Sequence, residues 1–436
     1  MNFTPWTLIV DVGLISVLLL LGKLLRAKLR FIQKLFVPPS LLAGFAALIL
    51  GPELLGWIPL SDNCGTYSGI LIALVFGCIP LTSTKKTGKS SEGVGRMWAY
   101  SNAGMLLQWA LGGALGIWVF SKFWPVDGAF GITMPAGFCG GHGTAAALGD
   151  SFGSEDIMTI AMTSATTGII AAVIIGLAMI KWGADHKKTS FISRYKDLPD
   201  ELRTGILPKD KRDSMGEATF SAISLDSLTF NLATIMIVVL GGYGASKLIS
   251  QLWPSLSFPV FICAFLVALL VRKLFDRFKV SEHTSPTMIS HISGTCTDYL
   301  VAFGVASIKL KVVWELIVPI SILFGVGLVF TFLYVVLVGK RLAGEYWFEK
   351  AVFTWGWFTG TMSMSIALLR ILDPDMKTGT LDDYAYAYIY VAPVEIALIA
   401  LAPIAFLSGF GVLYVAVSAL LGIGTLVVAR IKGWLK

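Results

Sequence analysis

Residues 65–81 read GTYSGILIALVFGCIPL, and residues 294–310 read GTCTDYLVAFGVASIKL. Aligned without a gap, the two stretches share Gly, Thr, Leu, Ala, Ile and Leu at matching positions. Each stretch is apolar and approaches the roughly 20 residues that a helix needs to cross a bilayer. A duplicated membrane helix predicts that the chain consists of two related halves.

Two further pairs of stretches match in the same order along the chain. One pair is PSLLAGFAALIL (39–50) and PVFICAFLVALL (259–270). The other pair is GFCGGHGTAAAL (137–148) and GWFTGTMSMSIAL (356–368), which places Gly141 on Gly360. Because apolar sequences often match by chance, the shared order is the stronger argument for an internal repeat.

The composition of the whole chain is that of a membrane protein. The 436 residues are 56% hydrophobic and only 14% charged, with a mean hydropathy of +0.77, whereas soluble domains carry roughly 25% charged residues. This excludes a soluble, disordered or fibrous protein. Apolar runs long enough to cross a membrane are expected at 7–25, 37–58, 64–81, 97–121, 157–182, 227–250, 257–274, 286–308, 312–338, 384–408 and 410–430.

Two further apolar stretches, 128–152 and 351–372, are interrupted by Gly, Thr and Ser. Such interruptions favour a re-entrant hairpin, which enters and leaves the membrane on one side, over a continuous crossing. The predicted fold is therefore an all-α polytopic membrane protein with two hairpins. The N-terminal segment lacks the basic start of a cleaved signal peptide, so the first helix is expected to stay in the protein.

The basic residues predict the orientation of the chain in the membrane. With the N-terminus outside and neither hairpin crossing, 30 of the 34 Lys and Arg residues lie on the inner side. The four outer ones are Lys122, Lys247, Lys309 and Lys311. This is a strong positive-inside bias, so the net charge of +7 reflects topology and indicates no nucleic-acid partner.

The repeat and the polar segments divide the chain into four parts. These are an N-terminal repeat (1–182), a Lys-, Arg- and Asp-rich cytoplasmic linker (183–226), a C-terminal repeat (227–408) and an extra helix with a tail (409–436). The alternative for the linker is a small folded cytoplasmic domain, but the segment has too few apolar residues to form a core. Each repeat has five crossings, and an odd number inverts the second repeat relative to the first. Inverted repeats are typical of secondary transporters.

The two hairpins carry the main candidate site residues, which are Gly140, Gly141, His142, Gly143 and Thr144 in the first and Gly360, Thr361, Ser363 and Ser365 in the second. Glycines let a ligand approach the backbone closely. Amides at a helix start suit an anion, and exposed carbonyls or hydroxyls suit sodium. The competing interpretations are helix packing for the glycines and bonds to helix carbonyls for the hydroxyls.

Asp298 and Glu395 are further candidates because ionisable residues are costly at membrane depth. Either one is a candidate to bind a cation or a proton. Asn102, Gln108, Thr166 and Asn231 are weaker candidates, since helix-to-helix hydrogen bonds explain them as well. The remaining weaker candidates are Thr163, Ser164, Thr167 and Arg370.

Other classes of site receive little support from the sequence. The five scattered cysteines are expected to be free thiols that pack helices. Cys139 and His142 are a conceivable nucleophile and base, but no third member is evident. We therefore expect no enzyme, no cofactor and no metal site beyond the transported sodium.

The chain resembles the bacterial sodium/glutamate symporter family. The resemblance rests on the opening helix, VPPSLLAG (37–44), the Cys139–Thr144 motif, the central loop and a second hairpin. It implies two inverted five-helix halves with opposed re-entrant loops, a substrate and sodium bound between them, and a homodimer. The chain departs from the family in TGTMSMSIALLRILDP (359–374), where the family has a glycine-rich motif, and in the extra span at 410–430.

The expected function is sodium-coupled symport of L-glutamate into the cell by alternating access. The expected location is the bacterial plasma membrane, with the C-terminus in the cytoplasm. The alternatives are a sodium- or proton-coupled carrier of another organic anion and a passive channel. Met362 and Met364 would make the site less polar and would favour an anion less polar than glutamate.

Overall fold

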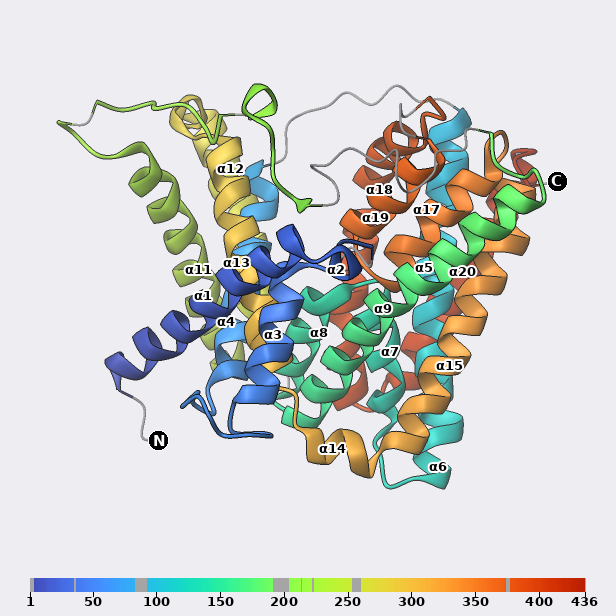
Figure 1. The fold of residues 1–436 in the computed structure, drawn as a ribbon, viewed down its shortest axis with the longest axis horizontal. Coiled ribbons are helices and arrows are strands. Elements are labelled where there is room, and N and C mark those ends of the chain that lie inside the picture. The colour runs from blue at the N-terminus through green and yellow to red at the C-terminus, as the bar shows by residue number, and fades with distance from the viewer. Residues whose placement is uncertain are drawn as a thin grey trace.

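The computed structural model describes residues 4–34, 37–82, 92–190, 204–212, 214–221, 223–252, 260–373 and 377–435. Over these residues the regular secondary structure is entirely helical, with no strand, and turns and loops connect the helices (Figure 1). The helices are α1 (Pro5–Lys28), α2 (Arg30–Lys34), α3 (Pro39–Leu50), α4 (Cys64–Thr82), α5 (Glu92–Leu115), α6 (Ser121–Phe123), α7 (Thr133–Phe138), α8 (Gly141–Phe152), α9 (Glu155–Asp185), α11 (Ser227–Leu252), α12 (Val260–Arg277), α13 (Pro286–Ala306), α14 (Leu310–Glu315), α15 (Ile317–Leu333), α16 (Gly339–Leu342), α17 (Trp347–Thr359), α18 (Met362–Leu372), α19 (Thr380–Leu407) and α20 (Gly411–Ile431).

Eight helical stretches in the described part of the chain are long and apolar enough to cross a membrane. They are α1, α4, α5 through α6, α9, α11, α15 through α16, α19 and α20. This confirms an all-helical, multi-span membrane protein. The expected spans at 257–274 and 286–308 correspond to α12 and α13, which are 18 and 21 residues long, and α12 carries four charged residues near its C-terminal end.

The expected span at 37–58 is shorter than predicted, because α3 ends at Leu50 after 12 residues. Gly51 adopts an extended conformation and is followed by Pro52, and a residue before proline is disfavoured in the helical region. The chain then turns through residues 51–62 toward α4. Asp11 of α1 secures this turn, since its fully buried carboxylate accepts three hydrogen bonds from Ser61 and Tyr67.

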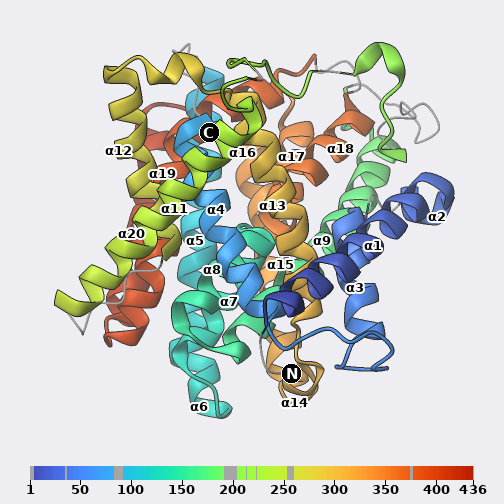
Figure 2. The same cartoon turned by 90° about the vertical axis from the view of Figure 1, so that its left-hand side faces the viewer.

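The helices form two groups, which lie on the left and right of Figure 1. In the first group, α4 packs against α13, and these are the helices that carry the matching stretches 65–81 and 294–310. Their neighbours are exchanged between the halves: α3, from the first half, packs on α13, whereas α12, from the second half, packs on α4. α1 then covers α3, and α11 covers α12 (Figure 2).

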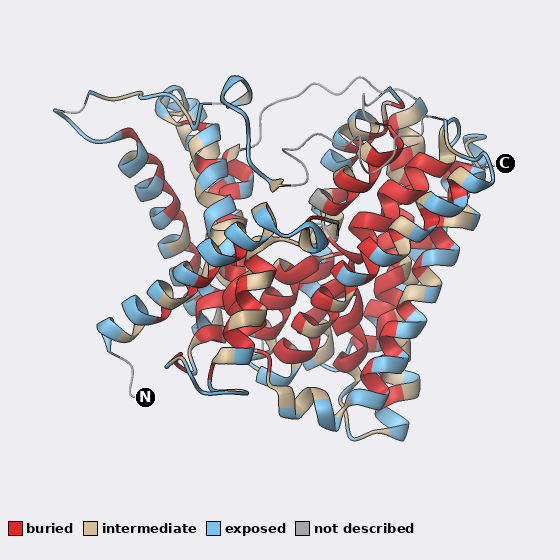
Figure 3. Cartoon of the chain, in the orientation of Figure 1, coloured by how far each residue is buried: buried red, intermediate tan, exposed pale blue. Residues whose placement is uncertain are grey.

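The second group is built around α5 and α9. α5 packs against α19 and α20, and α9 packs against α7, α8 and α17. Figure 3 shows that buried residues concentrate in the interior of this group, while outer helices such as α1 and α11 expose much of their length. Only 17% of the apolar window of α1 and 28% of that of α11 is buried. Apolar surface exposed on membrane-spanning helices is the surface that lipid covers.

Both interrupted stretches, 128–152 and 351–372, are broken helices. In the first, α7 ends at Phe138 and α8 begins at Gly141, whose φ of +64° lies in the left-handed region, where glycine is the default residue. In the second, α17 ends at Thr359 and Gly360 follows it, and the Thr361 side chain caps α18 by accepting a hydrogen bond from the Met364 amide.

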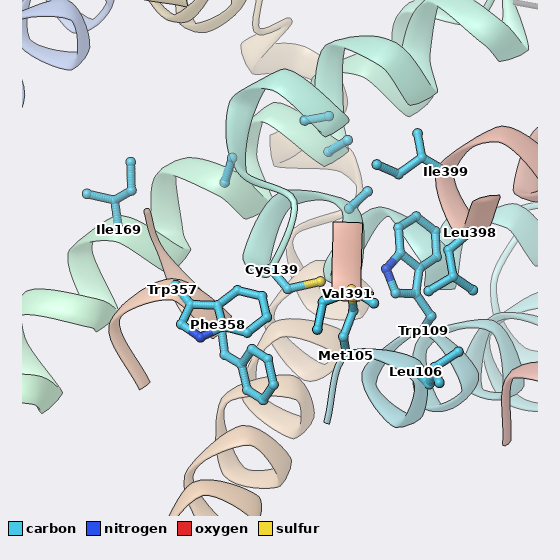
Figure 4. Close-up of a cluster of buried hydrophobic side chains, with 14 of the residues drawn as sticks. Met105, Leu106, Trp109, Cys139, Ile169, Trp357, Phe358, Val391, Leu398 and Ile399 are labelled. Carbon is cyan, nitrogen blue, oxygen red and sulfur yellow. The ribbon is translucent and has the colours of Figure 1, made fainter. Parts of the chain in front are cut away.

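A cluster of buried apolar side chains surrounds the first break (Figure 4). Cys139, at the end of α7, lies among Trp109 of α5, Trp357 of α17 and Val391 of α19. All four residues are less than 9% exposed. Close packing of this kind fixes the position of both helix breaks relative to α5 and α19.

Part of the predicted linker lies outside the described residues, namely 191–203, 213 and 222. The described part of 204–226 contains only a short 3₁₀ turn, Lys209–Lys211, besides extended segments, turns and bends. In the stretch 259–270, which matches residues 39–50 of α3, Pro259 also lies outside the described residues.

Candidate functional site

A cavity of about 930 Å³ lies where the two helix groups and both helix breaks meet. Nine of the predicted site residues line it: Gly140, Gly141, His142, Gly143, Thr144, Gly360, Thr361, Asp298 and Glu395. These residues come from α8, α13 and α19 and from the two breaks, so segments more than 200 residues apart in the sequence contribute to one site.

The two breaks approach each other closely. A Cβ atom added to Gly141 would lie 3.6 Å from the carbonyl oxygen of Gly360. The first turns of α8 and α18 therefore share one cavity, and no side chain caps the N-terminus of α8. Free amides at a helix start favour an anionic ligand.

The polar side chains of the first break are mostly held by neighbouring helices. His142 is 3% exposed, and its Nε2 lies 3.1 Å from Oγ1 of Thr166 on α9. The Cys139 thiol donates to the carbonyl oxygen of Pro135 at 3.2 Å. Cys139 and His142 thus have separate hydrogen-bond partners, and no nucleophile and base pair forms between them.

The hydroxyls of the second break divide between two environments. Thr361 lines the cavity, whereas Ser365 is fully buried and packs against Gly356 of α17. The Ser365 hydroxyl lies 3.5 Å from the Thr361 carbonyl oxygen, which is a bond within the helix. The Ser363 side chain lies outside the described residues.

Asp298 and Glu395 have different surroundings. Asp298, on α13, interacts with the Ser40 hydroxyl and with the Lys23 ammonium group. Glu395, on α19, accepts a 2.8 Å hydrogen bond from the Tyr388 hydroxyl through its Oε2. The described part of the chain gives Glu395 no ion pair.

The cavity wall is largely apolar and aromatic. Met362 and Met364 line it, as the alternative with a less polar site anticipated. The aromatic residues Trp357, Tyr384 and Tyr388 also line it, and these were not predicted. The seven-residue spacing of Tyr388 and Glu395 on one helix corresponds to two turns, so this pair was detectable in the sequence. The position of Trp357 depends on long-range packing and left no such signal.

The weaker polar candidates mostly join helices. Asn102 bonds to Thr425 of α20, and Asn231 accepts from the Ser285 amide. The Gln108 side chain amide donates to Oγ1 of Thr331 at 2.8 Å and to the Phe358 carbonyl oxygen at 3.2 Å. Gln108 thereby binds the carbonyl end of α17, where a broken helix leaves acceptors without partners.

All five cysteines are free thiols, as predicted, and four of them are buried. Among the described residues, no group of three or more His, Cys, Asp and Glu side chains is arranged to hold a metal ion.

Apolar membrane helices around an internal cavity that two broken helices line are typical of secondary transporters. The family model of the sodium/glutamate symporters matches residues 7–365, and the chain belongs to this family. A sodium/glutamate symporter from Escherichia coli (strain K12) is 22% identical over 340 residues, which are 75% of this chain and 79% of that protein. One from Shigella flexneri gives the same values. The family resemblance seen in the sequence is thus confirmed.

Proposed function

We propose that this protein is a sodium-coupled symporter that carries L-glutamate into the cell. The observation that supports this most is the meeting of Gly141 and Gly360, which puts the first turns of α8 and α18 on one cavity. Broken helices that point their starts at an anionic substrate are a recurring device of secondary transporters.

The chemistry of the cavity fits an acidic amino acid. Two helix starts offer amides to two carboxylates, and Glu395 offers its carboxylate to the substrate ammonium group. Hydroxyls of Thr144 and Thr361 and the exposed backbone of the breaks are oxygen ligands of the kind that sodium takes. The printed name of the Escherichia coli relative supports the same pair of solutes. Sodium is the coupling ion, and the proposal includes no cofactor.

The proposal includes two inverted repeats, 1–182 and 227–408, joined by a cytoplasmic linker at 183–226 and followed by the extra helix in 409–436. The exchanged packing of α3 on α13 and of α12 on α4 supports it. The broken pairs α7–α8 and α17–α18 are then opposed re-entrant hairpins whose tips meet near the midplane. Alternating access follows from movement of the α5–α9 group against the α4–α13 group. The α4–α13 group would form the contact between two copies in a homodimer.

The proposed location is the bacterial plasma membrane, with the N-terminus outside and the C-terminus in the cytoplasm. Figure 1 supports this because the N-terminus, α6 and α14 lie at one end of the molecule and the C-terminus lies at the other. Lys122 belongs to α6 and Lys311 to α14, so these outer basic residues share the end of the N-terminus.

Uptake of radiolabelled glutamate into proteoliposomes tests the function. We expect accumulation above equilibrium with an inward sodium gradient and none when potassium replaces sodium. Downhill flux without accumulation would indicate a channel instead. Sodium-driven accumulation of another organic anion that glutamate does not inhibit would contradict the substrate, and Met362 and Met364 in the wall make a less polar anion the second candidate.

A further inference from the structure

We propose that Glu395 binds a proton when the carrier is empty, so that each transport cycle returns one proton in the direction opposite to glutamate. This inference rests on the proposed symport and adds a second coupling ion to it. The site is the carboxyl group of Glu395, with the proton on Oε1, because Oε2 accepts the Tyr388 hydroxyl hydrogen.

The first argument is the absence of a positive charge around this carboxylate. In the described part of the chain, the titratable groups that interact with Glu395 are Tyr384 and Tyr388 from α19 itself and Cys139 from the end of α7. A phenol and a thiol carry no positive charge in either protonation state, so none of the three compensates an ionised Glu395.

The described helices packed against α19 bring no cation to Glu395 either. On α20, Arg430 is exposed in the last turn of the helix. On α5, Arg96 pairs with Glu92 at 2.7 Å. On α17, Lys350 pairs with Asp383 at 3.0 Å. On α8, His142 is bonded to Thr166. The remaining cation of the cavity wall is Arg26 of α1, which also bonds to the Val37 carbonyl oxygen and belongs to the other helix group.

Asp298 provides an internal comparison. It lies on the same cavity but in the α4–α13 group, where burial opposes its charge and the Ser40 hydroxyl and the positive charge of Lys23 favour it. A nearby cation lowers the cost of a carboxylate inside a membrane protein, whereas a carboxylate without one is expensive at that depth. Of the two acids that face the cavity, Glu395 is therefore the one that depends more on a proton or a ligand cation.

The occupant of Glu395 then changes during the cycle. The substrate ammonium group donates hydrogen bonds to the ionised carboxylate and supplies the missing positive charge, so glutamate binding releases the proton. After glutamate leaves on the inner side, Glu395 takes a proton from that side and the empty carrier returns with a neutral site. A neutral carboxyl group crosses a low-dielectric barrier more readily than a charged one.

Proton movement is measured during uptake in proteoliposomes that contain a pH-sensitive dye, with valinomycin and equal potassium holding the membrane potential at zero. We expect the lumen to become alkaline in step with glutamate uptake. The Glu395→Gln variant removes the proton-binding group and weakens the site for the ammonium group, so glutamate uptake should fall, and the uptake that remains should move no protons per glutamate. Wild-type uptake with no pH change, or an unchanged proton signal in Glu395→Gln, would overturn the proposal.

A second measurement is independent of transport and of the substrate. Infrared spectra are recorded of the reconstituted, substrate-free protein at neutral pH. The difference between wild type and Glu395→Gln should contain the C=O stretch of one protonated carboxylic acid, which is present in wild type and absent from the variant. The band should remain in Asp298→Asn, which is the matched control on the same cavity. If Glu395→Gln fails to fold, Tyr388→Phe should retain the band at a shifted frequency. A spectrum that Glu395→Gln and Tyr388→Phe leave unchanged would refute proton binding at this site even if the protein transports another solute.

Discussion

Replacing Gly141 by alanine tests whether the meeting point of the two helix breaks is the binding site. Gly141 has a φ of +64°, and Gly153, at the other end of the same helix α8, has a φ of +58°. An alanine in this region costs roughly 1–2 kcal/mol. Gly153→Ala is therefore a matched control, since its added Cβ meets no atom within 4 Å and it lies away from the cavity.

Both variants should lose similar stability, but only Gly141→Ala should lose transport. The strained residue can relax only by rotating the first turn of α8, which moves its amides away from the ligand. Loss of one hydrogen bond to a charged group costs about 1.5–3 kcal/mol, which corresponds to a roughly 10- to 150-fold rise in the apparent KM for glutamate. The assay is uptake at varied glutamate concentration, together with thermal unfolding in detergent. Equal transport defects in the two variants, or normal uptake by Gly141→Ala, would refute the reasoning.

Three further predictions concern residues outside the cavity. Lys350→Met leaves the partly buried Asp383 without its partner at 3.0 Å and should destabilise the protein by about 3–5 kcal/mol. Adding Asp383→Asn should recover part of this loss. Thermal unfolding of the single and the double variant measures both effects. Burial opposes the charge of Lys309, but its hydrogen bond and ion pair with Glu53, together with the nearby negative charges of Glu155 and Asp62, outweigh that effect and raise the pKa of Lys309. The contact therefore stabilises the fold fully below the pKa of an unfolded lysine, and this stabilisation is lost as pH rises through the pKa of the folded state. Wild type should be more stable than Lys309→Met by about 1 kcal/mol or less. This difference in Tm should vanish at strongly alkaline pH. Asp11→Ala removes the acceptor of three hydrogen bonds and should lower stability by about 1–3 kcal/mol, whereas an unchanged Tm would show that the turn after α3 does not depend on it.

Much of the site was predictable because its residues break local rules of membrane helices. Glycines in a row at 140–141 and acids at 298 and 395 are unfavourable in a plain crossing, and each of them lines the cavity. The internal repeat also aligned Gly141 with Gly360, the two glycines that lie close together in the structure. Nothing in the spacing indicates that Gln108 reaches the end of α17, because this contact depends on packing between distant segments.

The same distinction explains the differences in the fold. Apolar length predicted most crossings, but the Gly51–Pro52 pair shortened the helix expected over 37–58 to 12 residues. Thr361 and Ser365 look equivalent as hydroxyls spaced along one motif. Their surroundings separate them, since Thr361 caps α18 beside the cavity and Ser365, one turn further along the helix, packs against Gly356 of α17.

The exchanged packing of α3 on α13 and of α12 on α4 has a consequence for how the protein is made. α3 and α4 leave the ribosome long before α13, which begins at Pro286. The early helices must therefore wait in the bilayer with polar groups such as Ser68, whose hydroxyl bonds to the Leu300 carbonyl oxygen in the finished protein, still unpaired. Nascent chains that stop before α13 should then be recognised by quality-control proteases, while full-length chains escape them.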